Sequence, residues 1–281
     1  MAIIISFEVF SLNNENQESW NTISKSYQGE KKISLEDVHY GPVTPGEREL
    51  SLLDDVMGKR VLELGCGGGQ NSIVLTKWGA EVVGLDISEI QLEYANILAK
   101  NEGVKVEFVQ GRMENLTRFN DDNFDIVLSS HAIGYADDLK AVFMETKRVL
   151  KPRGFLVFCF EHPIYLTVGP ALENGDLREV RNYFDRTRNV WDWICFDGTK
   201  ATFNQGDWSI SEIINGLIET GMQIARIEEP RAYDIANMDV KAISKIPYIS
   251  EFKNQEYISK FVQVIRMIPF SLIVKARKIR K

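Results

Sequence analysis

The chain has 281 residues, of which 44% are hydrophobic and 26% are charged, so it can bury one sizeable core or a core with an added cap. Its formal net charge is −7. This acidic balance argues against an extended nucleic-acid interface, because phosphate binding needs a basic surface.

The cysteines and the N-terminal residues bear on metal binding and on the cellular compartment of the protein. The three cysteines form no Cys-x-x-Cys pair, so no metal site is predicted, and their sparse, odd number suits a reducing compartment. The apolar start, MAIIISFEVF, lacks a basic region and contains Glu8, which disfavours a signal peptide or a membrane span. We therefore expect a cytoplasmic protein without stable membrane insertion.

The first sixty residues are predicted to be largely helical. Trp20, Ile23, Ser24 and Tyr27 fall on one helical face, and core packing is the favoured role of Trp20. A loop broken by prolines and glycine follows, and a second helix is predicted over 47–58, with Gly58 as its C-terminal cap.

From Arg60 onward, short apolar strands alternate with helices. Such alternation predicts parallel strands joined by right-handed crossovers, which is a doubly wound α/β sheet. The predicted strands cover 60–65, 81–86, 104–110, 124–130 and 155–161, and the helices cover 70–79, 88–103 and 138–150.

Beyond Glu161 the alternation stops. The stretch 162–207 is long, polar and aromatic, and a second irregular stretch covers about 231–261. Between and after them we predict a helix over 208–221 and strands over 222–230 and 269–277. Long insertions without regular structure are usually functional, so the two stretches are interpreted as a lid over the sheet.

Six positive residues lie near the C-terminus with no acidic residue among them. A solvated tail is the favoured interpretation, and a contact with a membrane surface or an acidic partner is the alternative. The residues are Arg266, Lys275, Arg277, Lys278, Arg280 and Lys281.

The stretch VLELGCGGGQN, residues 61–71, places a glycine-rich turn between a strand and a helix. A dinucleotide fingerprint needs a third glycine where Gln70 stands, and a phosphate-binding P-loop needs a lysine that is absent here. Glu63, Gly65, Gly67 and Gly69 instead give Glu-x-Gly-x-Gly-x-Gly. Bare glycine backbone and a helix N-terminus suit a ligand that carries a carboxylate.

With this motif the sequence resembles the class I S-adenosylmethionine-dependent methyltransferases, in their small-molecule, type 11-like branch. The resemblance is good from Arg60 to about Glu161. It implies a Rossmann-like sheet of seven strands with a C-terminal antiparallel strand and an inserted lid. The expected parts are a helical segment closing over the cofactor (1–58), the cofactor-binding core (59–161), the lid (162–207) and the rest of the sheet (208–281).

The resemblance also implies cofactor-binding residues. Glu63 is expected to bind the ammonium group, and Asp86 the ribose hydroxyls, although NAD sites use an acid in the same way. Arg112 stands where the family usually has Asp, Met113 is expected against the adenine, and Glu114 at its amine, with a plain surface loop as the alternative. The full expected set is Tyr27, His39, Tyr40, Glu63, Gly65, Cys66, Gly67, Gln70, Asp86, Ile87, Gln91, Arg112, Met113, Glu114, Ser129 and Ser130.

The implied reaction is methyl transfer from S-adenosylmethionine to a small molecule or small peptide, at oxygen or nitrogen rather than carbon. His162 is the first candidate base and His131 the second, and packed imidazoles are the alternative. Tyr165, Trp191 and Trp193 are candidate substrate residues, or else the lid's own core. A nicotinamide-dependent oxidoreductase and a non-catalytic S-adenosylmethionine-binding module stay open as alternatives. Nothing in the sequence predicts the oligomeric state.

Overall fold

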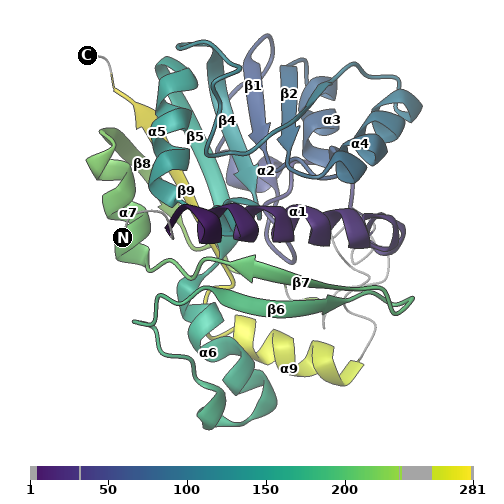
Figure 1. Ribbon diagram of the computed structural model, residues 1–281, viewed down its shortest axis with the longest axis vertical. Helices are drawn as coiled ribbons and strands as arrows, with labels where there is room; N and C mark the ends of the chain where they lie inside the picture. The colour runs from purple at the N-terminus through teal and green to yellow at the C-terminus, as the bar shows by residue number, and fades with distance from the viewer. Residues whose placement is uncertain (1–4, 32, 234, 236–254, 280–281) are drawn as a thin grey trace.

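The computed structural model describes residues 5–31, 33–233, 235 and 255–279. Within them, a central sheet has the strand order β3-β2-β1-β4-β5-β9-β8 (Figure 1). Strands β1 to β5 are parallel, and β9 is antiparallel to both of its neighbours. This confirms the predicted Rossmann-like sheet of seven strands. The strands are β1 (Arg60–Leu64), β2 (Glu81–Asp86), β3 (Glu107–Gln110), β4 (Phe124–Ser130), β5 (Leu150–Glu161), β8 (Met222–Glu228) and β9 (Ser271–Lys278).

Strand β1 shows why helices cover both faces of the sheet. Leu62 packs in one buried cluster with residues of α5 (Leu139–Val149) and α7 (Ile210–Glu219), whereas Val61 packs in another with residues of α3 (Gln70–Lys77). Successive side chains of a strand point to opposite faces of the sheet. An uninterrupted apolar run therefore gives the strand apolar side chains on both faces, and helices bury each face.

The predicted helix over 88–103 is confirmed as α4 (Glu89–Asn101), whose N-cap Ser88 accepts a hydrogen bond from the Gln91 amide. The predicted helix over 47–58 is wrong in extent, because α2 ends at Leu50. Ser51 adopts a left-handed conformation, and the Glu47 carboxylate accepts the amides of Leu52 and Leu53. A side chain therefore takes hydrogen bonds that a longer helix would have made along its backbone.

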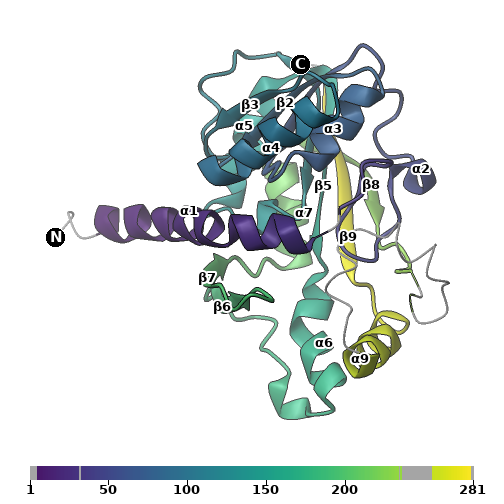
Figure 2. The same ribbon diagram turned by 90° about the vertical axis from the view of Figure 1, so that its right-hand side faces the viewer.

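The predicted lid region has regular structure of its own. It contains α6 (Pro163–Asn174), the 3-10 turn η2 (Leu177–Glu179) and an antiparallel hairpin of β6 (Asn189–Ile194) and β7 (Lys200–Gln205). Helix α1 (Ile5–Glu30) lies between this hairpin and the central sheet in both views (Figures 1 and 2). The N-terminal segment and the insertion thus pack on each other at one end of the sheet.

The second predicted irregular stretch falls mostly outside the described residues, at 234 and 236–254. From Gln255 the chain is helical, as α9 (Gln255–Ile265), which corrects the expectation that irregular chain continues to about Phe261. Helix α9 lies against α6, and Phe261 makes an edge contact with Tyr165.

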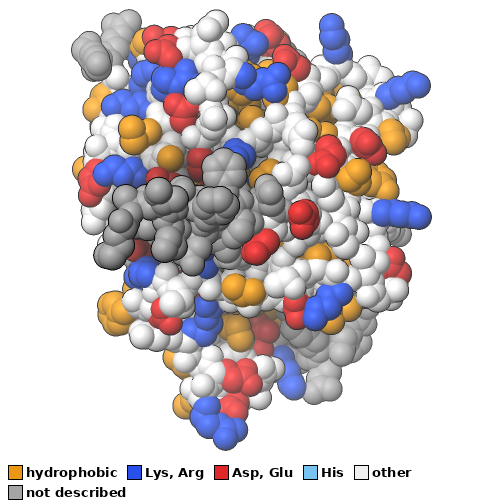
Figure 3. Space-filling view, viewed as in Figure 1, with side chains coloured by type: hydrophobic (Ala, Val, Ile, Leu, Met, Phe, Trp, Pro, Cys, Tyr) orange, Lys and Arg blue, Asp and Glu red, His pale blue; other side chains and the backbone are white. Residues whose placement is uncertain are grey.

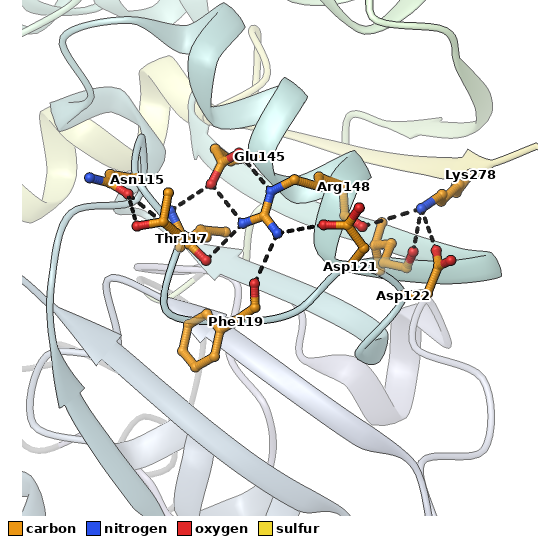
Figure 4. A network of polar contacts seen from close by, with 10 residues as sticks. Asn115, Thr117, Phe119, Asp121, Asp122, Glu145, Arg148 and Lys278 are labelled. Atoms are coloured by element: carbon orange, nitrogen blue, oxygen red, sulfur yellow. Dashed lines mark hydrogen bonds and ion pairs between the residues drawn. The ribbon is translucent and has the colours of Figure 1, made fainter.

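The basic C-terminal residues that the structure describes do not form a solvated tail. Lys275 is buried in β9 and pairs with Asp54 at 3.0 Å. Lys278 donates to Asp122 and to the carbonyls of Arg148 and Leu150 (Figure 4). These cations attach β9 to the rest of the sheet, which corrects the favoured interpretation.

Figure 4 also shows how the connection between β3 and β4 is held. The Arg148 guanidinium donates to the Glu145 and Asp121 carboxylates and to the carbonyls of Leu116 and Phe119. This connection carries Arg112, Met113 and Glu114, so α5 helps to position the predicted adenine residues.

The surface charge and the character of the helices bear on whether the protein binds nucleic acid or spans a membrane. On the face in Figure 3, positive and negative side chains are interspersed rather than gathered by sign. Among the described helices, none combines the length and the apolar character needed to cross a bilayer.

Candidate functional site

A cavity of about 620 Å³ lies at the carboxyl edge of the sheet. In doubly wound sheets, ligands bind at this edge. The cavity is lined by the loop after β1, the ends of β2, β4 and β5, helix α1 and the β6–β7 hairpin. One cavity therefore touches both the predicted cofactor motif and the predicted lid.

The glycine loop turns sharply and leaves its backbone bare. Gly65, Gly67 and Gly69 all have positive φ, at 69°, 51° and 79°. A Cβ on Gly65 would lie 2.2 Å from the Cβ of Ala132, and one on Gly69 would lie 2.7 Å from the Phe108 ring. The motif glycines are thus required by conformation and by close packing.

Glu63 is almost fully buried beneath this loop, and it lines the cavity. It accepts a hydrogen bond from the Ser72 hydroxyl at 2.5 Å. Burial raises the pKa of Glu63 to about 8, despite the hydrogen bonds that favour the carboxylate. A nearby cation would compensate for this burial, so the residue fits its predicted ammonium partner.

Asp86 ends strand β2 at the cavity. Its two oxygens accept the amides of Gly67 at 2.8 Å and of Ser88 at 2.9 Å. Burial raises the pKa of Asp86 to about 6, with the backbone hydrogen bonds acting in the opposite direction. A carboxylate has four lone pairs, more than the backbone amides use here, so Asp86 can still accept a hydrogen bond from a ligand hydroxyl.

The predicted adenine residues form a charged network. Arg112 contacts Asp137 at 2.8 Å and Glu114 at 3.3 Å, and Glu114 accepts the amide of Asp137 at 2.8 Å. Arg112, Met113 and Glu114 all line the cavity. The sequence offered no signal for Asp137, which supplies a carboxylate near the position where the family's usual Asp is replaced by Arg112.

His131 and Glu161 lie close together, and both line the cavity. Nδ1 of His131 lies 3.6 Å from Oε1 of Glu161. Burial alone would raise the pKa of Glu161, but the charge of His131 and hydrogen bonds outweigh burial and lower it. His131 has a positive φ of 52°, and its ring lies against Gly41, where a Cβ would come 1.9 Å from Nε2.

The hairpin and α1 supply an aromatic wall, made of Trp20, Tyr27, Trp191 and Trp193, which all line the cavity. The ring centroids of Trp191 and Trp193 are 5.5 Å apart, and those of Trp20 and Tyr27 are 5.4 Å apart. Trp20, for which core packing was favoured, packs in this cluster and also faces the cavity.

Most of the other predicted residues also line the cavity. Gln70, Ile87 and Gln91 lie beside the glycine loop, and Ser130 donates from its hydroxyl to the His39 carbonyl. The rest of this set is Cys66, His39 and the substrate candidate Tyr165. Burial, together with the charge of His131, lowers the pKa of His39 to about 3, so its imidazole is neutral at physiological pH.

Three predicted site residues lie elsewhere. Tyr40 is buried in the core, where its hydroxyl donates to Glu47 at 2.5 Å. Ser129 is fully buried and donates to the Leu64 carbonyl. His162 caps α6, with Nδ1 accepting the Ile164 amide and Nε2 lying 2.8 Å from Glu229. The structure therefore gives all three residues packing and capping contacts, and none of them is among the residues that line the cavity.

Several residues that line the cavity were not among the predicted site residues, and Glu161 and Gln28 are two of them. In the sequence, Glu161 served only to mark the end of the predicted core and was given no role in the site. Gln28 lines the cavity and hydrogen-bonds to Gln70 and Gln91. The neighbouring Tyr27 was predicted because it is aromatic. A glutamine on an amphipathic helix has no sequence feature that indicates a binding role.

The fold and the glycine loop at the carboxyl edge of the sheet are typical of Rossmann-like enzymes that bind a nucleotide-containing cofactor. The glycine loop of this protein departs from the pattern that binds dinucleotides. Comparison with known proteins narrows this class. Residues 62–158 match a family described as a methyltransferase domain.

Over 127 residues, the chain is 35% identical to the uncharacterized methyltransferase YbaJ of Bacillus subtilis, covering 45% of this chain and 50% of that relative. The match thus spans about half of the relative's length. An uncharacterized protein of Haemophilus influenzae is 28% identical over 264 residues, which cover 89% of this chain and 91% of that one. An S-adenosylmethionine-dependent methyltransferase of Mesorhizobium loti has the same fold, with a TM-score of 0.56, 23% identity and coverage of 81% and 94%.

Residues 62–158 thus match the methyltransferase domain family, and the fold is the one found in S-adenosylmethionine-dependent methyltransferases. This confirms the predicted family, and S-adenosylmethionine is the cofactor that the family implies.

Proposed function

We propose that this protein transfers a methyl group from S-adenosylmethionine to a small-molecule acceptor bound in the same cavity. The supporting observation is the cavity itself, which joins the glycine loop and Asp86 to the aromatic wall and to His131. A site with room for a donor and an acceptor side by side can align them for direct transfer.

S-adenosylmethionine supplies a methyl group activated on a sulfonium. On this proposal Glu63 and the glycine loop hold its amino-acid end, Asp86 its ribose, and Met113 with Glu114 its adenine. The bare loop, the buried acid beneath it and the remaining acceptor capacity of Asp86 support this assignment. Helix α1 and the hairpin exclude water from both ligands.

The acceptor is proposed to lie against Trp191, Trp193 and Tyr165, which all line the cavity. Oxygen or nitrogen is the proposed methylated atom, because His131 and Glu161 can take up a proton that such an acceptor loses. The Glu161 carboxylate lies 3.6 Å from Nδ1 of His131 and can orient its imidazole. In this scheme His131 is the base, and residues 1–58 and 162–207 are the parts that cover the core 59–161.

Isothermal titration calorimetry tests the cofactor assignment directly. We expect heat of binding with S-adenosylmethionine and none with NAD. Binding of NAD without binding of S-adenosylmethionine would contradict the proposal and favour the oxidoreductase alternative. Methyl transfer is then checked with a radiolabelled methyl donor and a panel of phenols and amines.

A further inference from the structure

A chain of three glutamine amides crosses from helix α1 to the core beside the glycine loop. Nε2 of Gln70 donates to Oε1 of Gln28 at 2.9 Å, and Nε2 of Gln28 donates to Oε1 of Gln91 at 2.7 Å. The three residues come from α1, the start of α3 and the first turn of α4. All three line the cavity.

Gln28 lies directly over Gly68. A Cβ on Gly68 would lie 2.5 Å from Nε2 and 2.6 Å from Oε1 of Gln28. Gly68 has no positive φ, so its backbone does not require glycine. Because Gly68 has no side chain, the Gln28 amide can pack directly against it. The Gln28 amide therefore forms part of the cavity lining next to the glycine loop.

The amide chain leaves hydrogen-bonding capacity at the loop. Each terminal amide has two N–H groups and two acceptor lone pairs, and the contacts along the chain use one N–H each of Gln70 and Gln28. Neutral amides can donate to a carboxylate while adding no charge to a region that already contains the buried acids Glu63 and Asp86. Donors at this place suit the zwitterionic amino-acid end of the cofactor better than its uncharged nucleoside part.

We infer that Gln28 binds the amino-acid end of the cofactor across the interface between α1 and the core, which rests on the function proposed above. Helix α1 then has a role beyond covering the site, since it contributes a polar group that completes the pocket. Gln70 and Gln91 hold the Gln28 amide in place from the core side.

A comparison of two ligands distinguishes binding of the amino-acid end by Gln28 from a general effect of the substitution on the pocket. S-adenosylhomocysteine carries the amino-acid end, and 5′-methylthioadenosine lacks it but keeps adenine, ribose and sulfur. Calorimetric affinities are measured for both ligands with the wild type and with Gln28→Ala. We expect Gln28→Ala to weaken S-adenosylhomocysteine on the order of tenfold, as for a lost hydrogen bond to a charged group, and to leave 5′-methylthioadenosine within about twofold.

Gln17→Ala is the matched control. Gln17 lies on the same helix and donates to Glu89 at 2.9 Å across the same interface, but it does not line the cavity. We expect it to leave both affinities unchanged. Gly68→Ala should reproduce the selective loss by displacing Gln28, and it should add nothing in the Gln28→Ala background.

Equal weakening of both ligands by Gln28→Ala, or no weakening of either, would overturn the inference while leaving the proposed function in place. A wild-type protein that bound neither ligand would overturn the proposed function, and the inference with it. A loss in Gln17→Ala as large as in Gln28→Ala would show that the helix interface matters and not the Gln28 amide.

Discussion

At the scale of single residues, Asp86 has the most sharply defined role. Its carboxylate is buried, shares both oxygens with backbone amides, and has a pKa raised to about 6. A carboxylate in this state is ionised at pH 7.5 and becomes largely protonated near pH 5. Protonation turns one oxygen into a donor, so the group becomes a poorer acceptor for the ribose hydroxyls.

We therefore expect Asp86→Ala to weaken binding of S-adenosylhomocysteine by about 1.5–3 kcal/mol at pH 7.5, the scale of hydrogen bonds to a charged group. Protonation of Asp86 should by itself lower wild-type affinity about tenfold between pH 7.5 and pH 5, because only about a tenth of this carboxyl is then ionised, and the Glu63 carboxyl, whose pKa is about 8, adds to the fall. Calorimetry at the two pH values checks both points. Asp86→Asn should fall about tenfold less than the wild type over this range, with the Glu63 contribution remaining. An unchanged affinity in Asp86→Ala would remove the ribose role.

At the scale of elements, the short helix α2 depends on one acidic side chain. Glu47 accepts hydrogen bonds from the hydroxyl of Tyr40 and the amides of Leu52 and Leu53. Gly41, which contacts the His131 ring, lies in the same segment as Tyr40. The end of α2 thus fixes the segment that packs against the proposed base.

Glu47→Ala leaves these buried donors without a partner. We expect it to lower the free energy of unfolding by about 3 kcal/mol, because unsatisfied buried polar groups are costly. Urea unfolding followed by circular dichroism measures the change. Glu49→Ala is the control on the same helix, since Glu49 is exposed, and it should change stability by less than about 0.5 kcal/mol. Equal losses in the two variants would contradict the role of Glu47.

At the scale of the whole molecule, α1 and the β6–β7 hairpin form one apolar unit over the cavity. Ile23 and Tyr27 of α1 share a buried cluster with Ala201 and Phe203 of β7. Asn16 adds two hydrogen bonds to the backbone of Asn204. By contrast, the hydrogen bonds from α1 to α4 are between polar side chains, such as Gln28 to Gln91.

A ligand beneath this unit should stabilise both of its parts together. We expect S-adenosylhomocysteine to slow amide hydrogen exchange in residues 15–30 and 189–205 alike, and to leave β9 unchanged, because local opening of shared structure is cooperative. Exchange measured by mass spectrometry provides the test. Protection confined to α1 would show that the two parts move separately.

The sequence predicted the alternating core because strand and helix periods are local properties. It also located the loop from Glu63 to Gly69, since the motif depends on spacing alone. It could not separate Ser130, at the cavity, from Ser129, in the core, because neighbouring strand residues face opposite sides and the register was unknown. The capping role of His162 could not be predicted, because α6, which it caps, was expected to be irregular chain. The contact of Gln28 with the glycine loop depends on how α1 crosses the core, which no local pattern encodes.

The place of β9 between β5 and β8 has a consequence for synthesis on the ribosome. Within the described residues, β8 pairs with β9 and with no other strand, although β8 precedes it in the chain. Strand β8 therefore emerges before its partner exists, whereas β1 to β5, which carry the glycine loop and Asp86, can already pair. The nascent chain can thus assemble the strands of the cofactor half first and complete the sheet only after residues 271–278 have been translated, as expected for a long-range β contact.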